Sequence, residues 1–562
     1  MSPVATLAPA RDLSADAVRA TYQALRDTLP APDAGAELWE AWFWRWNEAR
    51  VAIAGEGSRR YFRECQDTRD EAAVAAWRHM REQVYPISEE GDGELRHAFL
   101  AAGCRAALEA RLGKQLFVRL ALDDAGFAAE NVALQMEEME HVSHYDQLMG
   151  RATVEVAGET LTMVQVQARL LDPDAGRRQA AWDAMGAWFS QNADAVHATF
   201  TTLVGLRDRQ ARTLGDANFV PLAYRRMGRT EYGPTEVEAF RAAVLAHVVP
   251  LTAELRARQA RDLGTERVRA ADMMYFPGST LGTGVVPVDE QLDRAATLFA
   301  RMDPHIAGHF ARMRTEGLID LENRPGKKPG AFAMGIEDED RVAIFCNSTG
   351  AETDVSTLTH EMGHAIQSWE STWIKALDLR NPTMDAAEVH SFGMEYLSLK
   401  DIDAFFPAEL AGKFRRLRLM STIVRIPYMC AVDEFQHELY ARPDHSPAER
   451  EAIWARLWER YLPGLDFDDC PAQRQYRWMR QPHLFSTPFY YIDYALAEVG
   501  AMQLWQLAQD DPAGAMAAYL KLCHMGGTEP LLAMLRAGGL RSPFDADALP
   551  PLMAAVRREL GL

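Results

Sequence analysis

The segment His360-Glu-Met-Gly-His364 is the feature that most constrains how this 562-residue chain can fold. Leu358, Met362 and Ile366 give the segment an apolar side at helical spacing. Residues four apart lie on one face of a helix, so the two histidines can reach the same ion. We therefore predict a helix through this segment, with one face that binds a divalent metal.

Glu361 has a different position on that helix and a different predicted role. It lies about 100° around the helix axis from His360, so it cannot easily bind the same ion. It can, however, hold a water molecule that the ion binds. Zinc lowers the pKa of such a water to about 7, and a carboxylate can then remove its proton. Glu361 is the predicted general base, and Asp354, after the loop 348–352, is the predicted N-cap of the helix.

A catalytic zinc site needs a third protein ligand and an open position for water. Glu388 is the candidate, because it lies 28 residues after His360 on the next predicted helix, and two antiparallel helices would bring it to the ion. By chemistry, His390 and Glu395 are rival ligands. Glu395 lies two turns from Glu388 on the same face, so it can support the ligands by hydrogen bonding, whereas His390 points to a different face.

The pattern has a less specific interpretation, because His-Glu-x-x-His also arises by chance and a helix with two histidines can simply be polar surface. Two other clusters, in residues 137–144 and 433–438, combine histidines with acidic residues. Neither has a distant third ligand, and both are predicted to be charged helix faces.

The bulk composition is that of an ordinary globular chain, with 48% hydrophobic and 25% charged residues. The formal net charge of −20 argues against nucleic acid as a partner. Residues 1–25 lack the pattern of a secretory signal, and no apolar stretch is long enough to span a membrane. The six cysteines are scattered without CxxC spacing and are predicted to be reduced thiols. We therefore expect a cytoplasmic protein, and nothing in the sequence indicates an oligomeric state.

Most of the chain shows helical periodicity, so the predicted fold class is mostly α. One long helix is expected over 414–440, where Pro427 should bend or divide it. The Gly- and Pro-rich break at 277–287 is the best boundary. It would separate a helical N-terminal region, 1–280, from a zinc-bearing region, 281–562, with halves that interleave.

Strands are few. Residues 153–163 alternate around Ala-Gly and predict a short hairpin. A second hairpin is predicted from 331–336 and 341–347, which flank the acidic turn 337–340 and lie just before the histidine segment.

These blocks resemble the oligoendopeptidase F and thimet oligopeptidase family of zinc metallopeptidases. Residues 350–359, Gly-Ala-Glu-Thr-Asp-Val-Ser-Thr-Leu-Thr, are similar to that family's Gly-Thr-x-x-Asp-Val-x-Thr-Leu lead-in. Glu388 and Glu395 match its third ligand and a second acidic residue seven positions later. Residues 483–498 are similar to its histidine-plus-tyrosines block, most closely to the Pz-peptidase-like branch, and weaker similarity covers 117–562.

In that family, a histidine and tyrosines of this block face the bound peptide opposite the zinc. The resemblance therefore assigns His483, Tyr490, Tyr491 and Tyr494 to the catalytic site, although the spacing from His483 to Tyr490 departs from the thimet type. A phenol or a protonated imidazole can stabilise negative charge on a carbonyl oxygen. From the residues alone, 489–494 fits equally well as a packed aromatic helix.

The resemblance implies two helical halves that enclose a deep substrate channel, with a small β-sheet beside the zinc-binding helix. It implies one zinc ion held by His360, His364 and Glu388, in an endopeptidase that hydrolyses short oligopeptides, with the second hairpin pairing to extended substrate. One alternative is a helical zinc carboxypeptidase, and another is a non-enzymatic helical peptide-binding module. A structural zinc would normally have four protein ligands, and the sequence offers three good ones, which disfavours the module.

Overall fold

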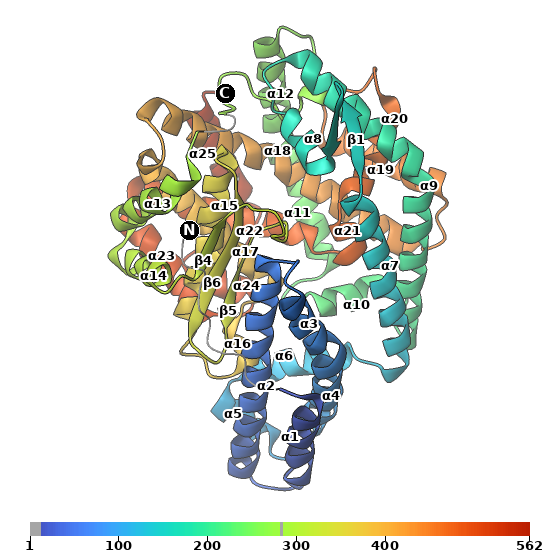
Figure 1. Ribbon diagram of the computed structural model, residues 1–562, viewed down its shortest axis with the longest axis vertical. Helices are drawn as coiled ribbons and strands as arrows, with labels where there is room; N and C mark the ends of the chain where they lie inside the picture. The colour runs from blue at the N-terminus through green and yellow to red at the C-terminus, as the bar shows by residue number, and fades with distance from the viewer. Residues whose placement is uncertain (1–12, 282–284) are drawn as a thin grey trace. The chain divides into compact units, whose positions relative to one another are not determined.

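The computed structural model describes residues 13–281 and 285–562, which form two compact units, each assembled from three segments of the chain (Figure 1). Unit 1 consists of Met1–Phe127, Thr283–Pro407 and Leu507–Leu540. Unit 2 consists of Ala128–Gly282, Ala408–Gln506 and Arg541–Leu562. The predicted break at 277–287 includes residues 282–284, which lie outside the described residues, and the division into 1–280 and 281–562 stays a prediction.

The chain is mostly helical, as predicted, and its described strands form three small sheets of order β1-β2, β3-β7 and β4-β6-β5. The main elements of unit 1 are α1 (Ala15–Asp27), α2 (Ala36–Gln66), α3 (Glu71–His79), α4 (Tyr85–Leu100), α5 (Arg105–Leu112), α6 (Lys114–Ala125), α13 (Val288–Met302), α14 (Pro304–Thr315), β4 (Ile319–Glu322), β5 (Phe332–Ile336), β6 (Arg341–Ser348), α15 (Glu352–Glu370), α16 (Leu377–Arg380), α17 (Met384–Ser398), α23 (Pro512–Met525) and α24 (Leu531–Ala537).

Unit 2 is built around long helices. Its main elements are α7 (Val132–Gly150), β1 (Thr153–Val156), β2 (Glu159–Thr162), α8 (Met163–Arg169), α9 (Ala175–Thr213), α10 (Phe219–Arg226), α11 (Pro234–His247), α12 (Val249–Leu263), β3 (Val268–Arg269), α18 (Ala408–Ala441), α19 (Pro447–Tyr461), β7 (Leu465–Asp466), α20 (Pro471–Tyr476), α21 (His483–Ser486), the greater part of α22 (Tyr491–Asp510) and α25 (Leu549–Leu560). The predicted hairpin at 153–163 is confirmed as β1 and β2, which pair antiparallel.

The N-terminal helices of unit 1 are held together by aromatic side chains. Trp39, Trp42, Phe43 and Trp46 recur at helical spacing along one face of α2 and are almost fully buried. They gather around Phe99 of α4, whose ring stacks on that of Phe43 with 5.1 Å between the centroids. Because each such side chain contributes roughly 1.5–3 kcal/mol on burial, this cluster is a main source of stability for these helices.

The three-stranded sheet of unit 1 lies directly before the histidine helix. Its central strand β6 pairs parallel to β4 and antiparallel to β5, with Phe332 opposite Phe345 and Ile336 opposite Arg341. The second predicted hairpin is thus confirmed, and α15 packs on its strands (Figure 1). Among the described strands none pairs with the other side of β5, so β5 is an edge strand.

The start of α15 differs from the prediction. The helix begins at Glu352 with Ala351 as N-cap, and Asp354 is its third residue. Asp354 instead turns back on the loop, and its Oδ2 accepts hydrogen bonds from the backbone N–H groups of Thr349, Gly350 and Ala351 at 2.6–3.0 Å. The predicted cap was three residues late because Asp354 occupies the third helical position, from which its carboxylate reaches back to the N-cap and the loop before it, as the third residue of a capping box does.

Pro427 does not divide α18, so that alternative in the prediction is wrong. A proline in a helix interior leaves the carbonyl four residues earlier without its usual partner. Here that carbonyl belongs to Ile423, and it accepts a buried hydrogen bond of 2.8 Å from the hydroxyl of Thr252 on α12. The lost helical bond is therefore replaced from a neighbouring helix, and α18 continues to Ala441.

Two predictions from composition can be compared with the described residues. All six cysteines are free. In the ranges 13–281 and 285–562, none of the helices combines the length and the apolar character needed to cross a membrane.

Candidate metal centre

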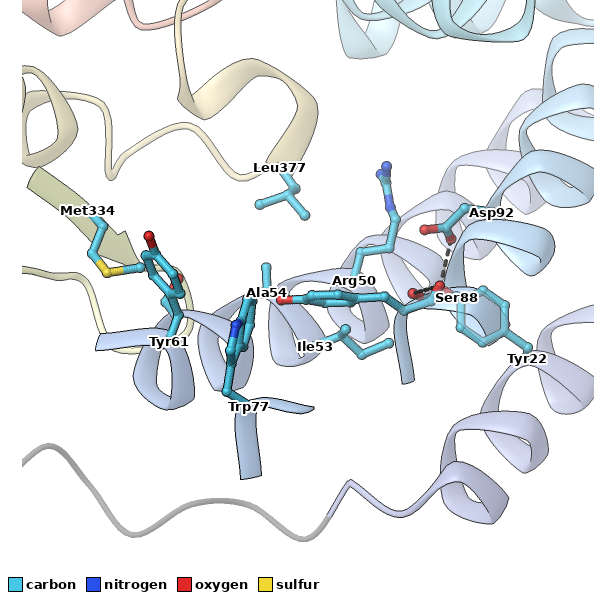
Figure 2. A pocket seen from close by; sticks show the side chains of 13 residues that line it. Tyr22, Arg50, Ile53, Ala54, Tyr61, Trp77, Ser88, Asp92, Met334 and Leu377 are labelled. Atoms are coloured by element: carbon cyan, nitrogen blue, oxygen red, sulfur yellow. Dashed lines mark hydrogen bonds between the residues drawn. The ribbon is translucent and has the colours of Figure 1, made fainter. Parts of the chain in front are cut away.

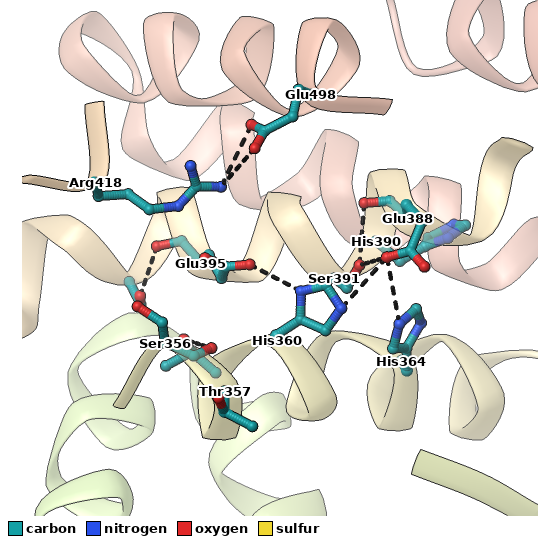
Figure 3. A network of polar contacts seen from close by, with 12 residues as sticks. Ser356, Thr357, His360, His364, Glu388, His390, Ser391, Glu395, Arg418 and Glu498 are labelled. Carbon is teal, nitrogen blue, oxygen red and sulfur yellow. Dashed lines mark hydrogen bonds and ion pairs between the residues drawn. The ribbon is translucent and has the colours of Figure 1, made fainter. Parts of the chain in front are cut away.

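The three predicted metal ligands lie together in unit 1, and each offers a donor atom within 4.8 Å of the other two. His360 and His364 extend from α15, and Glu388 meets them from α17 (Figure 3). The Nε2 atoms of the histidines lie 3.3 and 3.6 Å from Oε2 of Glu388. Two ligands that are each about 2.0–2.1 Å from a tetrahedral zinc lie about 3.3 Å apart. The donor set and its spacing therefore fit one zinc ion with a fourth position left for water.

Neighbouring side chains orient two of these ligands. Nδ1 of His360 lies 2.8 Å from Oε1 of Glu395, which leaves Nε2 to face Glu388 (Figure 3). The hydroxyl of Ser391 donates a hydrogen bond of 2.8 Å to Oε2 of Glu388. Such contacts fix the tautomer of a histidine ligand and the direction of a carboxylate ligand.

His390, the rival ligand, is not part of this group. It is fully buried, and its Nδ1 lies 3.2 Å from the backbone carbonyl of Ala387, one turn earlier on the same helix. Burial lowers the pKa of His390 to about 4, so the ring is neutral at physiological pH.

The electrostatics of the group suit a cation. Burial lowers the pKa of His364 to about 4, which leaves its imidazole neutral and its lone pair available. Burial also disfavours a charged His360, but hydrogen bonds to Glu388 and Glu395 outweigh that effect and raise its pKa. Burial alone would raise the pKa of Glu388, but the hydrogen bond and charges of the two histidines outweigh it and lower that pKa. The raised pKa of His360 shows that the two carboxylates stabilise a positive charge at this position, here the charge of a protonated imidazole.

Glu361 lies beside the group with its carboxylate buried, 5% exposed, and its Oε2 has no hydrogen-bond partner among the residues that the structure describes. Burial raises the pKa of Glu361 to about 7, although a hydrogen bond from the backbone of Ala333 acts in the opposite direction. Ala333 belongs to β5, so the predicted base lies against the edge strand of the sheet.

The crossing of α15 and α17 is braced by a third helix. The Tyr519 hydroxyl, from α23, donates a hydrogen bond of 3.1 Å to the backbone carbonyl of His390 and lies 3.5 Å from that of Gly363. Tyr519 is fully buried. It therefore ties together the two helices that supply the ligands.

The structure brings the predicted histidine and tyrosines of unit 2 close to one another. The ring of His483 lies 5.9 Å from that of Tyr490, 4.9 Å from that of Tyr491 and 5.8 Å from that of Tyr494, between centroids. Gln481 holds Nδ1 of His483 at 2.6 Å. Tyr490 is buried, whereas His483, Tyr491 and Tyr494 are half-buried.

The backbone that carries this cluster is strained and clamped. Phe489 has φ of +68°, a conformation that costs a non-glycine residue roughly 1–3 kcal/mol. Its N–H donates to Oε1 of Gln436 at 2.7 Å, and its carbonyl accepts from Arg229 at 2.6 Å. Arg229 also forms a fully buried ion pair of 2.5 Å with Asp493, in the first turn of α22. The sequence analysis did not identify Arg229 or Gln436. The signal that could have pointed to Arg229 is Asp493, because an acidic residue buried in an aromatic segment requires a partner.

A pocket of about 430 Å³ lies beside the sheet in unit 1 (Figure 2). Met334 of β5 reaches it, so it adjoins the edge strand. Its walls combine aromatic rings, such as Tyr61 and Trp77, with the charged side chains of Arg50 and Asp92.

Neither of the other clusters from sequence analysis gathers three donor atoms in the described part of the chain. Glu138, from residues 137–144, forms an ion pair of 2.6 Å with Arg207. His437, from residues 433–438, lies 3.3 Å from the Tyr224 hydroxyl. Residues 137–144 are exposed or half-buried, as predicted for a charged helix face. For residues 433–438 that prediction is wrong, because Asp433 is fully buried in an ion pair with an arginine.

Residues 169–552 match the sequence profile described as Peptidase family M3, and residues 9–127 match that of the Peptidase M3 N-terminal domain. The fold is similar to that of the solved structure of PZ peptidase A with an inhibitor, with a TM-score of 0.91 and 30% identity over 99% of this chain and 98% of that one.

Two curated relatives match parts of the chain. The Oligoendopeptidase F homolog of Borreliella burgdorferi is 24% identical over 240 residues, which cover 40% of this chain and 38% of that protein. The Group B oligopeptidase PepB of Streptococcus agalactiae serotype III is 22% identical over 374 residues, which cover 64% of this chain and 59% of that protein. Both matches span less than two thirds of the relative's own length.

Proposed function

Because the chain belongs to peptidase family M3, we propose that it is a zinc-dependent endopeptidase that hydrolyses short oligopeptides. The observation that carries the proposal is the convergence of three donor atoms, from His360, His364 and Glu388, beside the buried carboxylate of Glu361. Three protein ligands with a neighbouring base are typical of catalytic zinc sites, whereas structural sites use four protein ligands.

Each side chain of the centre has a defined task in this proposal. A zinc ion bound by the three ligands would supply a Lewis acid that polarises a peptide carbonyl and lowers the pKa of water. Glu395 accepts the Nδ1 proton of His360 and so presents Nε2 as a ligand. Glu361 takes a proton from the attacking water and later gives it to the leaving amine.

The substrate contacts are proposed from the edge strand. The free side of β5 offers backbone N–H and C=O groups to an extended peptide, which would bind by adding a strand to the sheet. Because Ala333 of β5 also contacts Glu361, main-chain pairing would place a peptide bond near the base. The pocket that Met334 reaches would receive a substrate side chain.

We assign His483, Tyr490, Tyr491 and Tyr494 to stabilisation of the oxyanion and positioning of the substrate. Hydrogen bonds from hydroxyl and imidazole groups become stronger as negative charge grows on the carbonyl oxygen. Loss of one such donor typically lowers the rate about a hundredfold or more. Their mutual proximity and the clamped backbone that carries them support this assignment.

A cytoplasmic location is proposed on the six free thiols, which suit a reducing compartment. The net charge of −20 gives no basis for binding nucleic acid. The expected partners are therefore short peptides.

The proposal is tested with a peptide blocked at both ends, which an endopeptidase cleaves and a carboxypeptidase does not. Glu361→Gln should retain one equivalent of zinc at the centre and lose turnover by about 10²- to 10⁴-fold. Glu409→Gln, on the exposed surface of α18, serves as the control and should be unaffected. A chelator should abolish hydrolysis, and zinc should restore it. Near-normal turnover of Glu361→Gln would remove the proposed base, and cleavage restricted to free C-termini would favour the carboxypeptidase.

A further inference from the structure

A second group of metal-ligand side chains lies in unit 1, outside the centre described above. It consists of His305 and His309 on α14 and Glu370 at the end of α15. The two histidines are four residues apart, the same spacing as His360 and His364. Sequence analysis missed them because no acidic base follows the first histidine.

The donor atoms of this group converge on one point. Nε2 of His305 lies 2.5 Å from Oε1 of Glu370, and Nε2 of His309 lies 3.4 Å from the same oxygen. The two Nε2 atoms are 3.3 Å apart. Two of the three separations equal the roughly 3.3 Å expected between ligands of a tetrahedral zinc. The third is a hydrogen bond, whose proton a metal ion would replace.

The surroundings hold these rings in place. The ring of His309 stacks on Trp369, with 5.1 Å between centroids and 27° between planes. A third imidazole approaches from α23, where Nδ1 of His524 lies 3.8 Å from Oε2 of Glu370. The ring of His524 stacks on Trp373, whose indole N–H donates to the backbone carbonyl of His524 at 2.9 Å. Both oxygens of Glu370 therefore face imidazole nitrogens.

We propose that His305, His309 and Glu370 bind a second divalent metal ion and that this ion is Zn²⁺. His524 lies just outside this ligand set, where its ring faces the second oxygen of Glu370. Imidazole with carboxylate is a ligand set that suits zinc. His305 and His524 are 53% and 58% exposed, so the ion can enter directly from solvent, whereas Glu370 is 15% exposed and anchors the site. This inference does not depend on the proposed peptidase activity.

The position of the site gives the ion a structural consequence. Glu370 is the last residue of the helix that carries His360 and His364, while the other ligands come from α14 and α23. A bound ion would join three elements that are separate in sequence. Because it would bind the folded chain more tightly than the unfolded chain, it would raise the melting temperature as its concentration increases.

The test measures zinc per chain by equilibrium dialysis and elemental analysis of the full-length protein. The wild type should bind two equivalents, and His305→Ala/His309→Ala should bind one while its peptide hydrolysis stays unchanged. His97→Ala, which removes a histidine that is 77% exposed on α4, is the matched control and should still bind two. Conversely, His360→Ala/His364→Ala should retain one equivalent. A His305→Ala/His309→Ala chain that binds as much zinc as the wild type would overturn the proposal, whatever the occupancy of the centre at His360 and His364.

A second measurement does not require any variant to fold. Zinc should protect His305 and His309 of the wild type from modification by diethylpyrocarbonate, read by mass spectrometry, and leave His97 reactive. Equal modification of His305 and His309 with and without zinc would also overturn the proposal. Unfolding of the His305→Ala/His309→Ala chain in chelator should match that of the wild type, which separates loss of the ion from loss of the fold.

Discussion

The backbones of Gly363 and His390 are in direct contact: a Cβ atom added to Gly363 would lie 2.5 Å from the carbonyl oxygen of His390 and 2.6 Å from the Cα of Ser391. No side chain can separate α15 from α17 at this point. Glu388 lies less than one turn before this contact on α17. The close approach of the helices therefore lets it reach both His360 and His364 on α15. The glycine in the motif is therefore explained by helix packing.

Gly363→Ala is expected to push the two helices apart, because the atoms in the way are backbone atoms. The free energy of unfolding should fall by about 1–3 kcal/mol, and zinc should bind at least tenfold more weakly. Gly205→Ala on α9 is the control, because in the described ranges no atom outside its own stretch of helix lies within 4 Å of the added Cβ. It should leave zinc binding unchanged and stabilise the helix by up to about 1 kcal/mol. Wild-type zinc affinity in Gly363→Ala, measured by competition with a chelator, would contradict this account.

Glu388→Ala and Glu395→Ala should weaken zinc binding to different extents. Glu388 offers a donor atom to the ion, whereas Glu395 contacts His360 through Nδ1, the nitrogen that faces away from Glu388. Loss of such an outer contact typically costs about 10- to 100-fold in metal affinity, and loss of the ligand should cost more. Zinc titrations of both variants decide the order. The reverse order would show that Glu388 is not the third ligand.

Arg229→Ala should lower turnover without changing the zinc content of the chain. The substitution removes the donor to the carbonyl of Phe489 and leaves Asp493 as a buried charge, at a cost of about 3–5 kcal/mol in stability. The backbone before Tyr490 then keeps its contact with Gln436 but loses the one with Arg229. Adding Asp493→Asn removes the buried charge that has lost Arg229 and should restore much of the stability but not the turnover. Recovery of both in the double variant would show that Arg229 serves stability alone.

Acid should weaken the link between α2 and α16. Arg50 forms two hydrogen bonds with Asp378, at 2.7 and 2.8 Å. Burial alone would raise the pKa of Asp378, but the charge and hydrogen bonds of Arg50 outweigh it, and the pKa lies below its ordinary value of 3.8. A lowered pKa means that the stabilisation is present above that ordinary value and is lost as the pH falls through the folded-state pKa.

Asp378→Asn should therefore reduce the free energy of unfolding by about 3 kcal/mol at pH 7. Its difference from the wild type should shrink progressively as the pH falls below 4. Urea denaturation at pH 7 and pH 3 measures both differences, and a difference that is independent of pH would rule out the ion pair as its cause.

The sequence was most informative where a function depends on residues within one helix or on two helices in succession. The spacing of His360 and His364, and the distance to Glu388, were enough to select side chains that the fold places together. The second hairpin was equally clear, because alternating strands flank a four-residue acidic turn. These features arise from local periodicity, which a single sequence records directly.

Contacts between distant segments were not predictable in this way. Arg229 meets Phe489 across 260 positions, and the Tyr519 hydroxyl meets His390 across 129. The same limit explains the error at Pro427, since its freed carbonyl is satisfied by Thr252 on another helix. Such partners depend on tertiary packing, and the spacing of residues in a single sequence does not show which distant segments pack together.

The three-segment construction of unit 1 has a consequence for biosynthesis. Its first helices leave the ribosome early, but α23, which carries the tyrosine that braces the ligand helices, follows almost 400 residues later. At a synthesis rate of about 5–20 residues per second, the nascent chain waits roughly 20–80 s for that helix. Loading of the catalytic ion is therefore expected to follow the synthesis of α23.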